Sequence, residues 1–261
     1  FLLRLPPAAA DGPVPLVLVL HGHHGDGAVA DDITHFEAAA DRQGVAIAYP
    51  EGTGPLRRVG LSWNTGGGFG WAEAHGVDDV GFVDALLDTL IARRLVRADD
   101  VVASGFSAGG MLALRLACER ATRFVGVVDV AGTMPDTTCH PARPLRVLLV
   151  QGDRDADLRS EHAAVRALHL TLGRGHAFAR SLEGAFLFWA RHDRCGPRRE
   201  AERHDRWYAV RALDCAPAAG ATLVTIDGHP HAWPGGERSW WLAPRPSDAV
   251  DAAEMTLRML R

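Results

Sequence analysis

The chain has 261 residues, of which 47% are hydrophobic and 23% are charged, and its formal net charge is -4. This length is enough to bury a large core, and the composition is that of an ordinary globular protein. The lack of a basic surplus argues against a nucleic-acid partner, and no apolar run reaches the roughly 18 residues of a membrane-spanning helix.

Short apolar runs alternate with stretches of helical pattern along the chain, which is typical of parallel strands covered on both faces. We expect strands at 14–20, 45–49, 101–104, 124–130, 145–150 and 221–226. We expect helices at about 31–43, 78–94, 108–121, 181–193 and 248–260. The alternation predicts a single α/β domain over residues 1–261, with a mostly parallel central sheet and helices on both faces. Ligands of such a sheet bind beyond the carboxyl ends of the strands.

The strand expected at 101–104 leads into Gly105-Phe106-Ser107-Ala108-Gly109, and a helical pattern follows directly. A G-x-S-x-G string between a strand and a helix is typical of a nucleophile elbow, a tight turn that holds its serine in a strained backbone conformation. The two glycines allow the strand and the helix to approach closely. We therefore expect Ser107 to be a catalytic nucleophile, which needs a base and an acid that orients the base.

Candidates for the acid and the base follow the last two predicted parallel strands, in the chain order that this architecture uses. The carboxylates are Asp153, Asp155 and Asp157, and the histidines are His229 and His231. The order along the chain leaves both histidines open as the base. Asp153 and Asp157 are expected to be solvated turn residues or helix caps.

An oxyanion needs backbone N–H donors held in place before the reaction. We expect one from Ala108, which follows the nucleophile, and one from His23, in the Gly-rich loop after strand 14–20. Five tryptophans fall in the loops around this site: Trp63, Trp71, Trp233, Trp240 and Trp241. Trp63 and Trp233 are expected to contact the substrate, with the anchoring of long loops as the alternative.

The four cysteines lack the C-x-x-C spacing of zinc or redox sites, and they form two pairs that are local in sequence. This pattern predicts disulfides between Cys118 and Cys139 and between Cys195 and Cys215, with four reduced thiols in a cytosolic enzyme as the alternative. The segment after Phe1 is too short for the core of a signal peptide. We therefore expect that any targeting segment was removed or never included.

Five strings occur along the chain in a fixed order. They are Leu20-His21-Gly22, Ser62-Trp63-Asn64, Val77-Asp78-Asp79-Val80-Gly81-Phe82, Gly105-Phe106-Ser107-Ala108-Gly109-Gly110 and His231-Ala232-Trp233-Pro234-Gly235-Gly236. In these strings the chain resembles secreted esterases of the poly(3-hydroxybutyrate) depolymerase and feruloyl esterase type, carbohydrate esterase family 1. The resemblance implies an α/β-hydrolase fold and hydrolysis of carboxylic esters through an acyl-enzyme, without a metal or an organic cofactor.

Carried over residue by residue, the resemblance places the nucleophile at Ser107 and the base at His231. The spacing from His231 to Trp233 is that of the family's string, which leaves His229 as an expected surface loop residue. The acid of the family sits in an H-G-T-x-D string, which here reads Gln151-Gly152-Asp153-Arg154-Asp155 and points to Asp155. Two positions of that string differ, so Asp153 and Asp157 stay alternatives. The cysteines also resemble those of the family, which favours disulfides and a secreted or periplasmic protein.

Three alternatives remain beside a serine esterase of small-molecule or polymeric esters, whose oligomeric state the sequence leaves open. His21, His23 and Asp26 come close to the H-x-H-x-D-H string of dinuclear zinc hydrolases, but their spacing is wrong by one residue. A second alternative keeps the fold as a binding module without catalysis. A third is an acyltransferase, which would pass the acyl group to an alcohol instead of water.

Overall fold

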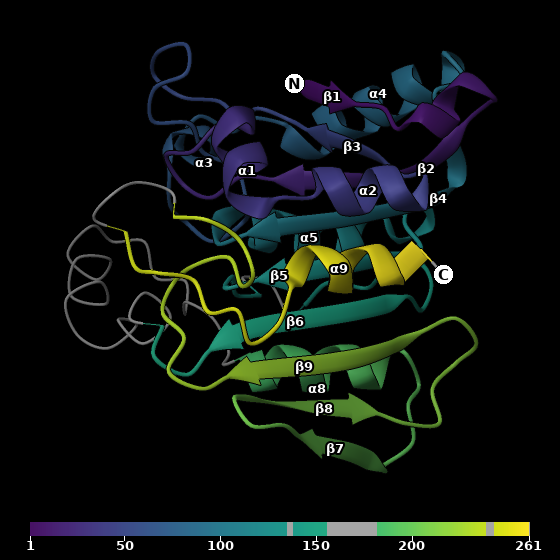
Figure 1. Ribbon diagram of the computed structural model, residues 1–261, viewed down its shortest axis with the longest axis vertical. Helices are drawn as coiled ribbons and strands as arrows, with labels where there is room; N and C mark the ends of the chain where they lie inside the picture. Colours follow the sequence, from purple (N-terminus) through teal and green to yellow (C-terminus); the bar gives the residue numbers. More distant parts are fainter. Residues whose placement is uncertain (135–137, 156–181, 239–242, 261) are drawn as a thin grey trace.

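A mixed sheet of nine strands forms the centre of the protein in the computed structural model, which describes residues 1–134, 138–155, 182–238 and 243–260 (Figure 1). The strands are β1 (Leu2–Arg4), β2 (Val14–Leu20), β3 (Ala46–Tyr49), β4 (Val96–Phe106), β5 (Gly126–Val130), β6 (Arg146–Gly152), β7 (Arg199–Arg203), β8 (Trp207–Ala212) and β9 (Gly220–Ile226). Their order across the sheet is β1-β3-β2-β4-β5-β6-β9-β8-β7. The strands from β3 to β9 in this order run parallel, and β1, β8 and β7 are antiparallel to their neighbours.

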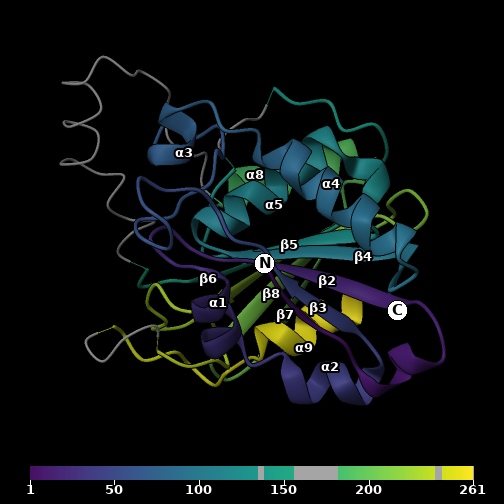
Figure 2. The same cartoon turned by 90° about the horizontal axis from the view of Figure 1, so that it is seen from above.

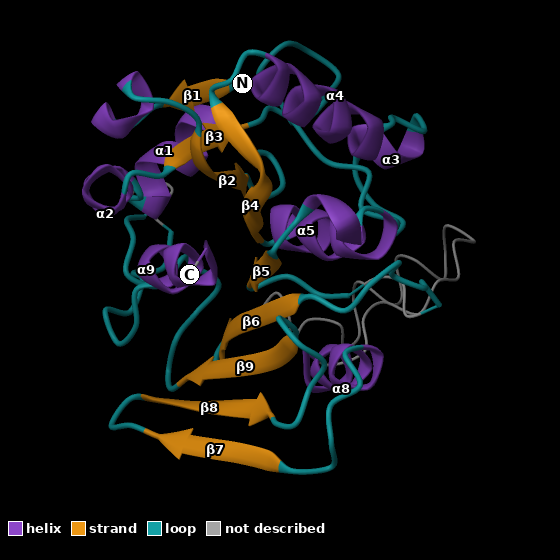
Figure 3. Ribbon diagram, turned by 90° about the vertical axis from the view of Figure 1, so that its right-hand side faces the viewer, coloured by secondary structure: helices purple, strands orange, loops and turns teal. Residues whose placement is uncertain are grey.

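Helices cover both faces of the sheet (Figures 2 and 3). One face carries α4 (Asp79–Ala92), α5 (Ala108–Glu119) and α8 (Leu182–His192), and the other carries α1 (Gly27–Thr34), α2 (Glu37–Gln43) and α9 (Ala252–Leu257). Shorter elements are α3 (Trp71–Ala74) and the 3-10 turns η1 (Pro7–Ala10), η2 (Ala121–Arg123) and η4 (Arg258–Leu260). The predicted α/β fold class is confirmed.

Strand β2 shows why the central strands read as continuous apolar runs. Leu16, Leu18 and Leu20 belong to the core on the α5 face, whereas Val17 and Val19 belong to the core on the α9 face. All five side chains are at most 1% exposed. Because both faces are covered, no position along the strand favours a polar residue.

The carboxyl ends of the parallel strands meet at one edge of the sheet, on the left in Figure 1, where the arrowheads of β6 and β9 point. The loops that follow β2, β4, β5, β6 and β9 begin at this edge. Every residue predicted to carry the chemistry lies in one of these loops or directly after one of these strands.

The helix predicted at 31–43 is two helices in the structure. His35 has a φ of 54° and ends α1, and α2 begins at Glu37. A residue in the left-handed region cannot continue a right-handed helix, so the chain turns at this point. At the C-terminus, the helix predicted from 248 begins only at Ala252, because the Asp251 side chain caps it by accepting the N–H of Glu254.

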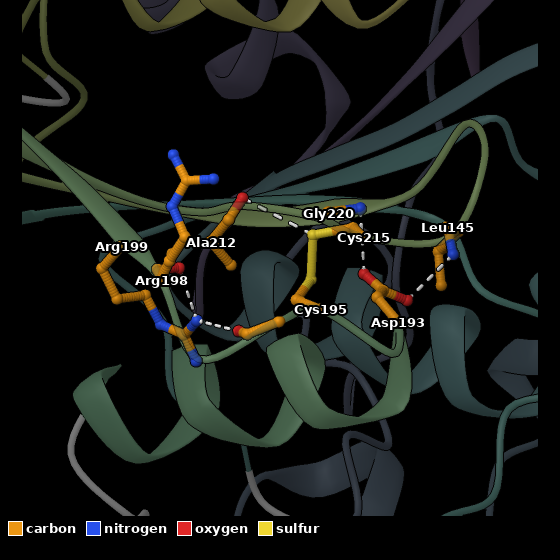
Figure 4. The surroundings of a disulfide bond; sticks show 9 residues. Leu145, Asp193, Cys195, Arg198, Arg199, Ala212, Cys215 and Gly220 are labelled. Carbon is orange, nitrogen blue, oxygen red and sulfur yellow. Dashed lines mark hydrogen bonds between the residues drawn. A yellow bond between two sulfur atoms is a disulfide. The ribbon is translucent and has the colours of Figure 1, made fainter.

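Both predicted disulfides are present in the structure. Cys118 is bonded to Cys139, and Cys195 is bonded to Cys215. Figure 4 shows the second bond, which ties the end of α8 to the loop after β8. The alternative of four reduced thiols is therefore wrong.

Asp193 lies beside this second disulfide and is fully buried (Figure 4). Its carboxylate accepts the N–H of Leu145 at 3.1 Å and the N–H of Gly220 at 3.1 Å, just before β6 and at the start of β9. Burial raises the pKa of Asp193 to about 6, although the two N–H donors favour the anion. The carboxylate thus links the amino ends of two neighbouring strands, β6 and β9, through hydrogen bonds at the end of the sheet opposite the predicted site.

Candidate active site

Ser107 lies at the turn between β4 and α5 and has the strained backbone that the sequence predicts. Its φ is 54° and its ψ is -120°, a conformation that non-glycine residues rarely adopt. The N–H of Ser107 donates to the carbonyl oxygen of Val130 at 2.8 Å, which ties the turn to β5. The serine is half-buried.

The glycines on either side of Ser107 are needed because backbones pack against them. A Cβ atom on Gly105 would lie 2.6 Å from the backbone nitrogen of Gly110, inside α5. A Cβ atom on Gly109 would lie 2.7 Å from the carbonyl oxygen of His21. Real Cβ atoms do not approach other atoms this closely. Larger residues would therefore push the helix away from β2 and β4.

A histidine and a carboxylate meet beyond the ends of β6 and β9. His231 Nδ1 lies 2.8 Å from Asp155 Oδ2, although the two residues are 76 positions apart. Asp155 is 1% exposed and the side chain of His231 is 18% exposed. The N–H at Nδ1 donates to the carboxylate, which leaves Nε2 as the basic nitrogen of the ring. This is the tautomer that a general base needs.

The His231 ring lies next to the elbow. Its centroid is 4.8 Å from the centroid of the Phe106 ring, and Phe106 directly precedes Ser107. Segments that follow three different strands therefore come together at one edge of the sheet: the elbow after β4, Asp155 after β6 and His231 after β9.

The loop after β2 packs directly against the elbow. A Cβ atom on Gly22 would lie 3.5 Å from Ser107 Cβ and 3.1 Å from Phe106 Cδ1. His23 is the next residue, so its backbone N–H belongs to the part of the loop that borders Ser107. Ala108 is the first residue of α5, where an N–H has no acceptor within the helix. These two N–H groups remain our predicted oxyanion donors.

The other acid and base candidates have different surroundings. Asp153 is exposed and accepts the N–H of Gly228 at 2.6 Å, whereas Asp157 lies outside the described residues. His229 is only 1% exposed, so the prediction that it is a surface residue is wrong. The N–H of Ser247 donates to its Nδ1 at 3.1 Å, and its Nε2 bonds the carbonyl oxygen of Ala232 at 3.0 Å. Both nitrogens of His229 hold the loop together.

Trp63 and Trp233 do not offer surface to a substrate, because they are 0% and 1% exposed. Trp63 Nε1 donates to the carbonyl oxygen of His21 at 2.9 Å, and Trp233 packs against Phe36 with ring centroids 6.0 Å apart. The expectation that these two rings contact the substrate is corrected: they support the site loops from behind. Trp240 and Trp241 lie outside the described residues.

Phe69 also lies at this edge, although no sequence motif singled it out. Its half-buried ring stands edge-on to the ring of His23, with centroids 5.6 Å apart. Burial lowers the pKa of His23, so its imidazole is neutral. Phe69 is the one large apolar residue in the Gly-rich stretch 64–70, and that signal could have identified it.

The structure argues against the zinc alternative, because two of the side chains that would bind the metal, His21 and Asp26, make other hydrogen bonds. The N–H of Gly52 donates to His21 Nε2 at 2.9 Å, and His21 Nδ1 bonds the carbonyl oxygen of Gly22 at 2.8 Å. The carboxylate of Asp26 caps α1 by accepting the N–H of Val29 at 2.9 Å. Within the described part of the chain, no three His, Cys, Asp or Glu side chains are grouped to hold a metal ion.

A known protein family matches more than half of the chain. Residues 1–167 match the family described as Esterase PHB depolymerase. The chain belongs to this family. The family match includes Ser107 and Asp155 and ends before β9, so the assignment of His231 depends on its contact with Asp155.

Two relatives share parts of the family sequence. NocK of Nocardia uniformis subsp. tsuyamanensis is 40% identical over 151 residues, which are 57% of this chain and 42% of NocK. Feruloyl esterase B of Piromyces equi is 24% identical over 243 residues, which are 88% of this chain and 42% of that protein. The matched segments therefore cover less than half of either relative.

A solved structure shares the fold. The acetyl xylan esterase from Aspergillus awamori superposes with a TM-score of 0.61 at 13% identity, over 88% of both chains. At this level of identity the likeness concerns the arrangement of the sheet and helices.

Proposed function

We propose that this protein is a serine esterase that hydrolyses carboxylic esters through an acyl-enzyme, with Ser107 as the nucleophile, His231 as the base and Asp155 as the acid. The observation that carries the proposal is the hydrogen bond between His231 and the buried Asp155 beside a strained serine turn. Membership of the Esterase PHB depolymerase family supports the same reaction.

Acylation begins when the Ser107 hydroxyl oxygen attacks the ester carbonyl carbon. His231 Nε2 takes the hydroxyl proton as the new C–O bond forms, and the carbonyl oxygen becomes an oxyanion. The backbone N–H groups of Ala108 and His23 stabilise this charge. The tetrahedral intermediate then expels the alcohol, which receives the proton from His231, and the acyl group remains on Ser107.

Deacylation repeats these steps with water as the nucleophile. His231 takes a proton from the water as its oxygen attacks the acyl carbon, and it returns that proton to Ser107 as the carboxylic acid leaves. Asp155 holds the ring in the required tautomer and stabilises the imidazolium that forms twice in each cycle. No step requires a metal or an organic cofactor.

The substrates that we propose are esters with an aromatic or aliphatic acyl group, either small or attached to a polymer. Phe69 and Phe106 supply apolar ring surface next to the rings of His23 and His231. The named activities of the relatives, feruloyl and acetyl xylan esterases, belong to the same class of substrate. Polyhydroxyalkanoates form a further class, as the family description indicates.

The two disulfides support a location in an oxidising compartment, and we propose that the protein is secreted or periplasmic. Among the described residues, no helix is both long and apolar enough to cross a bilayer.

A substrate panel tests the proposal. Purified protein is assayed with p-nitrophenyl esters of increasing acyl length, methyl ferulate, acetylated xylan and hydroxybutyrate oligomers. We expect hydrolysis in at least one class and a loss of kcat of at least about 1,000-fold in Ser107→Ala. Ser247→Ala is the matched control, because among the described residues its hydroxyl has one contact, the N–H of Ala249 that it accepts. Equal activity in Ser107→Ala and the wild type would refute the proposal.

A further inference from the structure

A second buried carboxyl lies beneath the elbow, and the mechanism does not use it. Asp129 is in β5, opposite Gly105 of β4 in the sheet register, and it is 0% exposed. Its side chain points to the α5 face, as does Val127 two residues earlier. The residue is therefore enclosed between the sheet and the helix that begins at Ser107.

Two glycines make the space that the Asp129 carboxyl occupies. A Cβ atom on Gly110 of α5, or on Gly132 after β5, would overlap with Asp129 Oδ1. The Cβ atom on Gly132 would also lie 2.8 Å from the carbonyl oxygen of Ser107. Gly132 is thus packed between the carboxyl and the backbone of the nucleophile. Any movement of this carboxyl would be transmitted to Ser107 through one residue.

Almost nothing in the described part of the structure would stabilise a negative charge on the Asp129 carboxyl. Among the described residues, neither of its oxygens has a hydrogen-bond partner of ordinary geometry. Burial raises the pKa of Asp129 to about 8, although the N–H of Gly132 acts in the opposite direction. The side chain is therefore a neutral acid at pH 7, and it becomes a buried anion as the pH rises above 8.

Within the described residues, no ionisable side chain faces Asp129 from the elements packed around it. The ionisable residues of α5 are Arg115 and Glu119, which lie further along the helix and pair with each other at 2.6 Å. The ionisable residues of β4 and β6 lie toward the opposite ends of these strands: Arg97, Asp99, Asp100 and Arg146. The described loop 131–134 carries none. Only water drawn into the core, or a shift of the backbone, could solvate the anion.

We propose that Asp129 is a positioning residue of the esterase: its neutral form allows Gly110 and Gly132 to pack under Ser107, and its ionisation displaces them and sets an alkaline limit on catalysis. This inference rests on the proposed function, because it takes Ser107 as the nucleophile.

The test compares the pH dependence of kcat/KM between pH 6 and 10 in the wild type, Asp129→Asn and Asp129→Ala, corrected for spontaneous hydrolysis. The wild type at pH 9 should retain about a tenth of its pH 7 value, as expected for one deprotonation near pH 8. Asp129→Asn keeps the size of the side chain and cannot ionise, so its kcat/KM should change less than about two-fold between pH 7 and pH 9. Asp129→Ala serves the same purpose if the Asn variant does not fold.

Asp153→Asn is the matched control, because it removes an exposed carboxylate near the same edge of the sheet. Its decrease in kcat/KM at alkaline pH should coincide with that of the wild type. If both Asp129 variants show the same alkaline decrease as the wild type while Ser107→Ala is inactive, the role of Asp129 alone is overturned. If Ser107→Ala is as active as the wild type, the proposed function fails and the role of Asp129 fails with it.

Discussion

Replacing Asp155 by Asn removes the charge that orients the proposed base and changes little else. Asp155 Oδ2 accepts from His231 Nδ1 at 2.8 Å, and the carboxylate is 1% exposed, so the substituted side chain cannot turn away into solvent. An amide N–H directed at Nδ1 would place the ring proton on Nε2, where it could not accept the proton of Ser107. The same change in a Ser-His-Asp protease lowers kcat about 10⁴-fold. We expect a similar loss here, about 5 kcal/mol of transition-state stabilisation, with little change in KM.

The assay is steady-state hydrolysis of the best p-nitrophenyl ester, with Asp153→Asn as the control. Asp153 is exposed and bonds only the N–H of Gly228 among the described contacts, so its variant should stay within about three-fold of the wild type. Asp157→Asn completes the set, since the sequence leaves this residue as an alternative. A large loss in Asp157→Asn beside a nearly unchanged Asp155→Asn would refute the assignment of the acid.

Three further predictions concern stability. Asp193→Ala should lower the free energy of unfolding by about 2–4 kcal/mol in urea denaturation, because the N–H groups of Leu145 and Gly220 lose their acceptor; a loss below about 0.5 kcal/mol would contradict this role of Asp193. Asp129 has a pKa raised from 3.8 to about 8, so its contribution to stability falls as the pH rises through this window. The free energy of unfolding of Asp129→Asn should therefore rise relative to that of the wild type by up to about 5 kcal/mol between pH 4 and 8. The same pH dependence of stability in both proteins would contradict this. Reducing the disulfide between Cys195 and Cys215, or replacing both by Ser, opens a loop of 20 residues and should cost about 3 kcal/mol; an unchanged thermal midpoint would count against it.

The centre of the fold could be predicted from the sequence because burial on both faces leaves a clear apolar signal. Strand β2 shows this signal at nearly every position. Strand β7, in contrast, reads Arg-Glu-Ala-Glu-Arg and is exposed throughout, so no apolar pattern marks it. It is the last strand in the order across the sheet and forms by pairing with β8, a contact that sequence periodicity does not reveal. The break at His35 depends on one left-handed residue and was equally hidden.

The candidate site could be predicted where backbone geometry restricts the residue type. Gly105 and Gly109 identify the elbow because only glycine fits between the packed backbones. The burial of Trp63 and His229 could not be predicted, because a large polar-aromatic side chain in a long loop suits either a substrate cleft or the support of the loop. Three-dimensional packing decides between these roles, and here it favours support.

Covalent trapping of the nucleophile is the most direct test of the central claim that Ser107, His231 and Asp155 act together. The folded protein is treated with an organophosphonate that carries a reporter group, and the modified peptide is identified by mass spectrometry. We predict one adduct per chain, on Ser107, and a labelling rate that falls by orders of magnitude in His231→Ala. An adduct on another residue, or ester hydrolysis that continues at the full rate after Ser107 is labelled, would contradict the account.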